Sequence, residues 1–239
     1  MQTVENADIM GKKVADQLVE TICRAGIRHI YAVTGDSLNE VNDAVRRAGT
    51  VRWVHVRHEE SGAFAAAAES ELNGIACCAG SSGPGHVHLI NGLYDAHRSN
   101  CPVLAIASTC PSDQFGTGYF QETDPIRLFD DCSGYNQMAV TPAQFARMLP
   151  AALQHAIHRR EVAVVGLPGD VAASPCAESP GASGPLPSHG IYRPLDGELR
   201  QLAEMIGSAE RITVFCGIGA REAHDEVVRL AAMLKAPVA

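Results

Sequence analysis

Glu59 is the residue of this sequence whose surroundings are best suited to acid–base chemistry. It follows a short apolar run, 51–56, and opens an alanine-rich segment, 59–72, so we expect it at a corner between a strand and a helix. A carboxyl group held on a rigid element in a partly dry pocket has the shifted pKa that proton transfer needs. Alternatively, Glu59 and Glu60 are only first-turn acids, which the helix dipole favours. Spacing alone leaves both interpretations open.

A glycine-rich turn, Gly83-Pro84-Gly85, follows the next apolar run, 75–79. Glycines between a strand and a helix bring backbone N–H groups close to a ligand. The turn is not a Walker loop, because no Gly-Lys-Ser/Thr follows it. It is not a dinucleotide fingerprint either, because His88 stands where the last glycine would be. The alternative is a helix start that requires only a tight turn.

Three further features allow both a functional and an ordinary interpretation. His86 and His88 lie two residues apart, so they do not form the H-x-x-x-H pair of metal sites, and we predict no metal ligands in this chain. Asn91-Gly92 weakens the helix that contains it, which either close approach by a ligand or another chain, or a local kink, would explain. Tyr119 and Phe120 in the long loop 108–125 indicate a lid or a subunit contact, or else anchor that loop to the core.

Strand-like and helical segments alternate along the whole chain. The expected helices are 14–25, 38–47, 59–72, 85–95, 142–158, 195–206 and 221–234. The expected strands are 27–33, 51–56, 75–79, 102–107, 138–140, 162–167 and 212–215. Asp36 or Ser37 is expected to cap the second helix, and Thr141 the fifth. This alternation predicts an α/β fold with a mainly parallel sheet flanked by helices.

Composition changes divide the sequence into two domains. Residues 12–175 carry the first, behind a loose arm at 1–11, and 176–194 read as a linker because they are dense in Pro, Gly and Ser. The β/α alternation restarts at 195–239, where Gly217-Ile218-Gly219 resembles a dinucleotide turn but lacks its last glycine. One strand and two helices cannot make an independent sheet. We therefore expect 195–239 to be the beginning of a second α/β domain in a truncated sequence.

Charge, cysteine content and hydropathy exclude several classes of protein. The 239 residues carry 19 basic and 27 acidic side chains, a formal charge of −8, which disfavours nucleic acid or an anionic membrane as partner. Eight cysteines without a C-x-x-C pair indicate small apolar residues in a reducing cytosol rather than disulfides or zinc ligands. We see no signal peptide and no apolar run of about 18 residues, so we expect a cytoplasmic protein.

Five stretches in matching order and spacing, over residues 12–175, resemble one known family. They are YAVTGDSLNEVNDAV, RHEESGAFAAAAE, CAGSSGPGHVHLINGLYDAHRSNCPVLAIA, GTGYFQETDP and VVGLPGDVA. Together they resemble the N-terminal part of thiamine-diphosphate-dependent 2-keto acid enzymes, most closely the pyruvate oxidase and pyruvate dehydrogenase (quinone) type. Acetolactate synthase and glyoxylate carboligase share the general pattern, while the G-x-G-Y-F-Q-E loop and His88 favour the pyruvate oxidase branch.

The resemblance implies roles for particular residues. Glu59 matches the glutamate that hydrogen-bonds N1′ of the aminopyrimidine of thiamine diphosphate and promotes the imino tautomer, which takes the C2 proton. Gly83, Pro84 and Gly85 match the turn that lines the pyrimidine pocket, and we predict that they bind the cofactor together with Glu59 and Asn91. The residues matching positions near the reacting centre, which we predict to be catalytic together with Glu59, are His88, Phe120 and Gln121. The first domain is then the pyrimidine-binding domain, and 195–239 begins a middle, FAD-binding-like domain.

The departures from the family concern the metal and the flavin. Relatives bind the diphosphate and Mg²⁺ through a G-D-G…N motif in a third domain, whereas the Gly-Asp pairs here, Gly35-Asp36 and Gly169-Asp170, do not continue in that way. We therefore expect Mg²⁺ and FAD to be held mainly outside this chain. The resemblance implies a site completed by the C-terminal domain of another subunit, in a homo-oligomer such as a homotetramer, and a chain inactive alone.

The predicted function is oxidation of pyruvate to acetate and CO₂, with FAD and a quinone as electron acceptors. The resemblance leaves room for a full-length enzyme that lies peripherally at the inner membrane. Three alternatives stay open: an acetolactate synthase-like carboligase, a short subunit that pairs with a separate diphosphate-binding chain, and a non-catalytic nucleotide-binding α/β module.

Overall fold

The computed structural model describes residues 11–177 and 193–239. The predicted N-terminal arm therefore lies outside the described residues except for Gly11, as does most of the predicted linker. The chain consists of two compact units, divided between residues 189 and 190.

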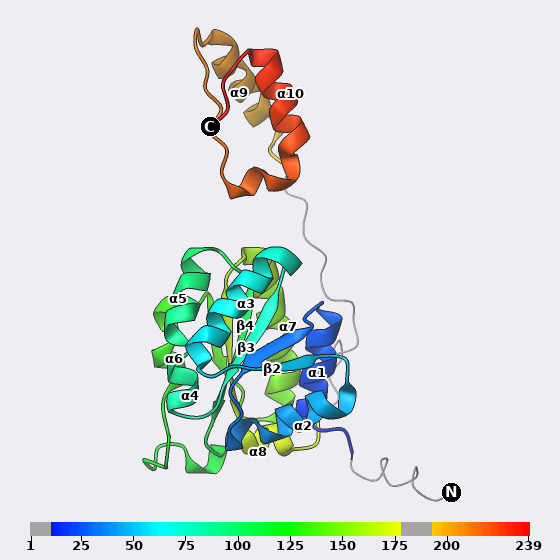
Figure 1. The fold of residues 1–239 in the computed structure, drawn as a ribbon, viewed down its shortest axis with the longest axis vertical. Helices are drawn as coiled ribbons and strands as arrows, with labels where there is room; N and C mark the ends of the chain where they lie inside the picture. The colour runs from blue at the N-terminus through cyan, green and yellow to red at the C-terminus, as the bar shows by residue number, and fades with distance from the viewer. Residues whose placement is uncertain (1–10, 178–192) are drawn as a thin grey trace, which may run out of the picture. The chain divides into compact units, whose positions relative to one another are not determined.

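The first unit contains one six-stranded sheet in which every neighbouring pair of strands is parallel, in the order β2-β1-β3-β4-β6-β5 (Figure 1). The strands are β1 His29–Ala32, β2 Arg52–His55, β3 Ala76–Gly80, β4 Val103–Thr109, β5 Tyr135–Met138 and β6 Val162–Pro168. The predicted α/β fold with a parallel sheet is confirmed. The predicted strand 138–140 is misplaced, because β5 pairs through the largely polar Tyr135–Met138, whose sequence carries no strand-like apolar pattern.

Five long helices cover the sheet, close to where the sequence predicts them. They are α1 Val14–Arg24, α2 Asn39–Ala48, α3 Glu59–Asn73, α5 Ile90–Arg98 and α7 Pro142–Arg159. Shorter helices are α4 Pro84–Val87, α6 Pro125–Leu128 and α8 Gly169–Ala173, and the 3₁₀ turns are η1 Asp36–Leu38, η2 Ser112–Gln114 and η3 Asp130–Cys132. The predicted cap of α7 is confirmed, since Thr141 accepts a hydrogen bond from the backbone N–H of Gln144.

The predicted helix 85–95 is wrong as a single element. The chain forms α4, passes through His88 and Leu89, and only then begins α5. The predicted side-chain cap of α2 is also wrong. Ser37 lies inside η1, and its hydroxyl is committed to Ser81 Oγ and to the N–H of Ser82 instead.

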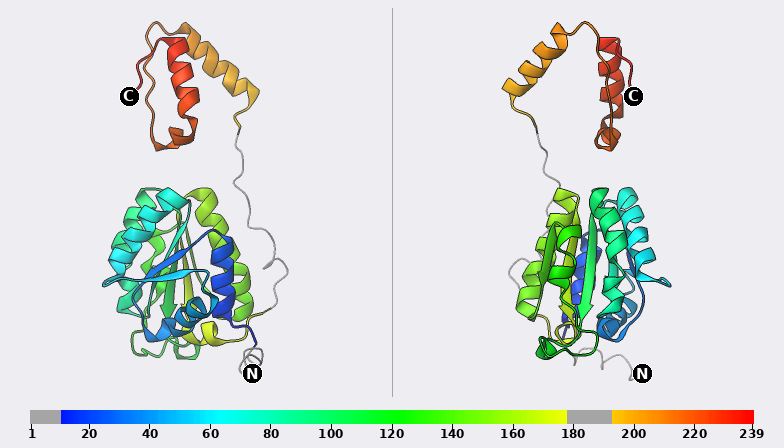
Figure 2. Two further views of the ribbon diagram at one scale, coloured as in Figure 1. Left: turned by 45° about the vertical axis from the view of Figure 1, so that its right-hand side comes forward. Right: turned by 90° about the vertical axis from the view of Figure 1, so that its left-hand side faces the viewer.

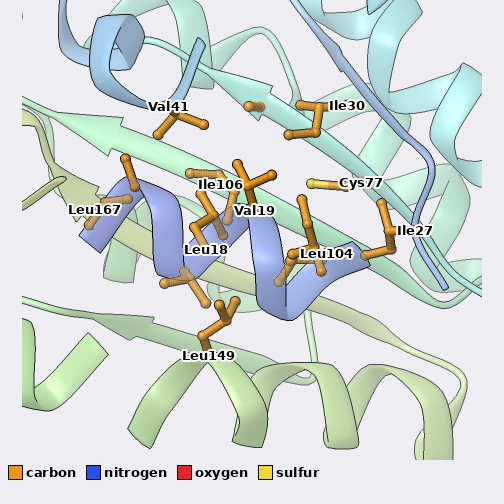
Figure 3. Packing of buried hydrophobic residues seen from close by; sticks show 14 of the residues in the cluster. Leu18, Val19, Ile27, Ile30, Val41, Cys77, Leu104, Ile106, Leu149 and Leu167 are labelled. Atoms are coloured by element: carbon orange, nitrogen blue, oxygen red, sulfur yellow. The ribbon is translucent and has the colours of Figure 1, made fainter. Parts of the chain in front are cut away.

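Helices cover both faces of the sheet (Figure 2). Alternate residues of each central strand enter two separate cores, one on each face. In β3, Cys77 belongs to the core under α1, α2 and α7, while Cys78 belongs to the core under α3 and α5. Figure 3 shows the first core, where Leu18 and Val19 of α1 lie against Ile106 and Cys77. Burial raises the pKa of the Cys78 thiol to about 12, consistent with a cysteine used as a small apolar residue.

Helices α3 and α5 approach each other closely through small residues. A Cβ added at Gly92 would lie 2.5 Å from Ala63 Cβ and 2.8 Å from the backbone nitrogen of Phe64. Glycine at position 92 is therefore explained by a neighbouring helix of the same chain, rather than by a ligand, another chain or a kink. This contact sets the distance between the two helices that follow β2 and the glycine-rich turn.

The second unit contains α9 Asp196–Ser208, the 3₁₀ helix η4 Ile218–Ala223 and α10 His224–Leu234. The predicted strand 212–215 is wrong: Val214 makes only an isolated parallel bridge to Val238. Two short segments without further neighbours do not extend into a regular sheet. Among the described residues, the helices are all too short or too polar to cross a membrane.

Candidate active site at the carboxyl edge of the sheet

The carboxyl ends of β1, β2 and β3 bring the predicted site residues to one edge of the sheet. From β1 the chain crosses to β2 on one side, and β3 lies on the other, so strand order reverses between β1 and β3. Ligands of open α/β sheets bind at such a point. Here Ser37, which follows β1, and Ser81, which follows β3, lie with their Oγ atoms 2.9 Å apart. The N–H of Ser82 also donates to Ser37 Oγ over 2.9 Å, so this serine fixes the two loops on each other.

Glu59 is the first residue of α3, three residues beyond Val56. His58 precedes it in an extended conformation and caps the helix, accepting from the N–H of Glu60. Only 7% of Glu59 is exposed, although a carboxylate is costly to bury. The N-terminus of a helix stabilises a negative charge there. Both interpretations of Glu59 therefore remain physically compatible: it is a first-turn acid, and it is also a carboxylate held in a dry position.

His88 is the residue that contacts the Glu59 carboxylate. Its Nδ1 lies 3.1 Å from Glu59 Oε2, and its ring stacks on that of His58 with centroids 4.4 Å apart and planes 25° apart. An ionised carboxylate only accepts hydrogen bonds, so Nδ1 of His88 carries the hydrogen. Glu59 and His88 were separate predictions from the sequence, and the fold brings them together. His58 was not predicted, since nothing in its spacing relates it to His88.

The glycine-rich turn requires glycine at position 83 and is tight at position 85. Gly83 has φ +67°, and a side chain there would meet Gln121 Cβ at 2.7 Å. A Cβ at Gly85 would lie 3.1 Å from Ser81 Cβ and 3.4 Å from Glu59 Oε1. Oε1 of Glu59 therefore faces Gly85, where any side chain would come into contact with it. A carboxylate with one oxygen held by a histidine and the other facing a bare glycine fits an acceptor for a flat, hydrogen-bonding ring.

The long loop reaches the same turn through Gln121. This residue has φ +60°, which is unusual without a glycine, and its Oε1 accepts from Ser82 Oγ over 3.3 Å. Phe120 beside it is 77% exposed, so it does not anchor the loop to the core. Anchoring comes instead from Glu122, whose carboxylate accepts from the N–H groups of Gly116, Gly118 and Tyr119. These hydrogen bonds, that of Gly116 first, lower the pKa of Glu122.

His86 is a buried residue of the turn to which the sequence assigned no role. Its Nδ1 lies 2.8 Å from the carbonyl oxygen of Ser108 at the end of β4, and its Nε2 lies 2.5 Å from Thr123 Oγ1 in the long loop. Burial lowers the pKa of this histidine, so the neutral form is favoured, with Nδ1 donating to the carbonyl and Nε2 accepting from the hydroxyl. His86 thus ties the turn, β4 and the loop together.

A cavity of about 420 Å³ opens beside these loops. Its walls include Asp36, Ser37, Ser82, Gln121 and Asp170, from the ends of β1, β3 and β6 and from the long loop. Asn91 lies elsewhere, exposed on the first turn of α5. Of the predicted site residues, Phe120 and Gln121 line the cavity. The others do not line it, namely Glu59, Gly83, Pro84, Gly85, His88 and Asn91.

Comparison with known proteins gives one family match and several relatives. Residues 12–128 match the N-terminal TPP binding domain of thiamine pyrophosphate enzymes. The chain is 48% identical, over 228 residues, to an uncharacterised 42.6 kDa protein encoded in the isoamylase 3′ region of Pseudomonas amyloderamosa, covering 95% of this chain and 58% of that protein.

Two relatives have named activities. Pyruvate oxidase of Lactiplantibacillus plantarum is 35% identical over 89% of this chain and 36% of its own length. Chloroplastic acetolactate synthase of Arabidopsis thaliana is 30% identical over 95% of this chain and 35% of its own length. The chain thus spans well under two thirds of the length of each of these relatives.

Proposed function

We propose that the chain, whose residues 12–128 match the N-terminal TPP binding domain of thiamine pyrophosphate enzymes, supplies the pyrimidine-binding half of a thiamine-diphosphate site acting on a 2-keto acid. The observation that carries the proposal is the Glu59 carboxylate, buried at the start of α3 with Gly85 opposite one of its oxygens. A buried carboxylate facing a bare glycine suits a ring nitrogen that must exchange a proton.

In this proposal Glu59 holds the proton at N1′ of the aminopyrimidine through Oε1. His88 keeps the carboxylate in place by donating from Nδ1 to Oε2, 3.1 Å away. Gly85 keeps the face of the carboxylate open, and the Ser37–Ser81 hydrogen bond fixes the neighbouring loops. Gln121 and the exposed Phe120 form the part of the long loop that closes over the reacting centre. Bound thiamine diphosphate itself would supply the carbanion chemistry that cleaves the 2-keto acid.

The diphosphate and Mg²⁺ are assigned to a complementary domain. Neither Gly35-Asp36 nor Gly169-Asp170 continues as G-D-G, and Asp170 accepts instead from the N–H and hydroxyl of Ser112. A C-terminal domain of another subunit in a homo-oligomer, with FAD held largely by a middle domain, would complete such a site. We further propose that the complete enzyme is cytoplasmic, with contact at the inner membrane surface as an alternative.

Pyruvate oxidation with FAD and a quinone as acceptors is the specific reaction that we favour. It is supported by the G-x-G-Y-F-Q-E loop and by 35% identity to a pyruvate oxidase. The second candidate is acetolactate synthesis, supported by 30% identity to an acetolactate synthase over 95% of the chain. Both reactions use pyruvate, and they differ in whether the two-carbon unit is oxidised to acetate or transferred to a second pyruvate.

The test combines the chain, complemented with the C-terminal portion of one of its longer relatives, with thiamine diphosphate and Mg²⁺. Exchange of the thiazolium C2 proton for deuterium, followed by NMR, reads out the action of Glu59 before any substrate is added. Glu59→Gln should slow this exchange by at least roughly 100-fold, the lower limit of general acid–base contributions, while the adjacent Glu60→Gln should leave it near the wild-type rate. Equal exchange in the wild type and Glu59→Gln would refute the assignment.

Product analysis then separates the two reactions. With pyruvate and a quinone acceptor, acetate is the product expected of the oxidase and acetolactate that of the carboligase. Acetolactate as the main product would overturn our preference for oxidation while leaving the role of Glu59 intact.

A further inference from the structure

Two imidazole rings and one carboxylate gather around the opening of the candidate site. His58, Glu59 and His88 each offer one ligand atom, and these atoms all lie within 4.8 Å of one another. They come from different elements: the end of the β2–α3 connection, the first residue of α3 and the residue after α4. Two histidines and one acidic residue are the ligands of one group of zinc sites, which leave a fourth position open.

We propose that His58, Glu59 and His88 form a binding site for a zinc-type divalent transition ion, and that the bound ion excludes the pyrimidine ring from Glu59. The exclusion of the pyrimidine ring rests on the proposed function, whereas the metal site itself does not. Imidazole nitrogen favours zinc-type ions, while Mg²⁺ prefers oxygen ligands, so this site is separate in chemistry from the Mg²⁺ assigned to the complementary domain.

The geometry of the Glu59–His88 pair already suits such an ion. Zinc bonds of about 2 Å to nitrogen and oxygen place two tetrahedral ligand atoms roughly 3.3 Å apart. Glu59 Oε2 and His88 Nδ1 lie 3.1 Å apart and share one hydrogen. An ion taking the place of that hydrogen therefore needs little movement of either side chain, and the hydrogen moves through solvent to Nε2 of His88, so the ring stays neutral.

His58 lies within reach of the same ion. Its side chain is 46% exposed, and its ring, which is stacked on that of His88, would rotate out of the stack to point a nitrogen lone pair at the ion. Its Nδ1 accepts from the N–H of Glu60 at the helix cap, which leaves Nε2 for the ion. The burial of Glu59 reduces competition from water for its carboxylate, and the exposure of both histidines gives the ion a way in.

Titration of the purified chain with Co²⁺, a spectroscopic substitute for zinc, tests the site. The visible absorption should show one ion with nitrogen and oxygen ligands. His58→Ala and His88→Ala should each weaken Co²⁺ binding by roughly tenfold or more. Mutation of a residue that only hydrogen-bonds a metal ligand typically costs about 10–100-fold in metal affinity, and these residues are proposed as ligands themselves. His55→Ala is the matched control, an exposed histidine at the end of β2 outside the cluster, and should bind Co²⁺ as the wild type does.

Unchanged Co²⁺ affinity in both cluster variants would overturn the site, as would a thiolate-to-cobalt charge-transfer band, which would place the ion on the cysteines.

Competition is measured with thiamine, which carries the pyrimidine ring but no diphosphate to chelate the ion. Thiamine should raise the apparent dissociation constant of Co²⁺. If thiamine binds to the chain without affecting Co²⁺, the exclusion is wrong. If thiamine does not bind even when the chain is complemented with the C-terminal portion of a longer relative, the proposed function fails while the metal result stands.

Discussion

The packing of α3 on α5 gives the most direct test of how this fold holds its site. Replacing Gly92 by alanine adds one methyl group, which would lie 2.5 Å from Ala63 Cβ and 2.8 Å from the backbone nitrogen of Phe64. Ordinary carbon contacts are about 3.5–4.0 Å. Both obstacles are rigid, because one is a Cβ and the other is backbone. The helices must therefore move apart by roughly 1 Å.

Two opposing effects set the size of the change. Overpacking of this kind costs about 1–3 kcal/mol, and the rigid obstacles favour the upper end. Alanine in place of glycine inside a helix stabilises the folded state by about 1 kcal/mol through its higher helix propensity. We therefore expect Gly92→Ala to lower the free energy of unfolding of the first unit by about 2 kcal/mol. Urea titration followed by the fluorescence of Trp53, the single tryptophan of the sequence, reports on that unit alone.

The control is Asn91→Ala, one residue earlier on an exposed face of the same helix, which should gain about 0.5 kcal/mol from helix propensity. A double-mutant cycle locates the cause: Ala63→Gly should cost less in the Gly92→Ala background than alone, because it removes the closest contact. If Gly92→Ala were as stable as the wild type, or more stable, the two helices would not be in the contact that we infer. Since Glu59 begins α3 and His88 lies two residues before the start of α5, the site geometry would then need another explanation.

Three further changes probe the loops around the site. Ser37→Ala should cost about 1–3 kcal/mol in urea unfolding, because it leaves the partly buried N–H of Ser82 without its acceptor; an unchanged midpoint would contradict this. The pKa of His86 is lowered in the folded state, so the unfolded chain binds more protons, and this contribution to stability is lost as pH falls from about 6.5 toward the folded pKa. The stability difference between the wild type and His86→Asn should therefore narrow over that range, and a constant difference would mean that His86 does not titrate on unfolding. Glu122→Gln should speed amide hydrogen exchange at 116–119 at neutral pH, because a carboxylate accepting three N–H groups is replaced by a neutral amide. In the wild type, exchange at 116–119 should speed up only when the pH falls below the usual pKa range of a glutamate, because the pKa of Glu122 is lowered. If these N–H groups stayed equally protected as Glu122 was protonated, the role of its carboxylate as their acceptor would be refuted.

The sequence predicted the regular elements well where apolar periodicity was strong. The run Val103–Ile106 is apolar at every position, and it is indeed buried on both faces of the sheet. Prediction failed where contacts distant in sequence decided the structure. The polar strand β5 exists because it pairs with β6, and the expected strand at 212–215 does not form because Val214 finds only Val238.

Local sequence determined that a carboxylate, Glu59, begins a helix after a strand, and that a glycine turn follows the next strand, because both depend on short-range signals of strand end and helix start. Family resemblance added roles that no spacing could supply. Only the tertiary structure brought His88 within 3.1 Å of Glu59, stacked His58 on His88, and buried His86 between Ser108 and Thr123. These partners are separated by 22 to 37 residues in the sequence, and they meet because parallel strands deliver their following loops to a common edge. The sequence thus determined which groups are available, and the packing of the sheet and its helices decided which of them can act together.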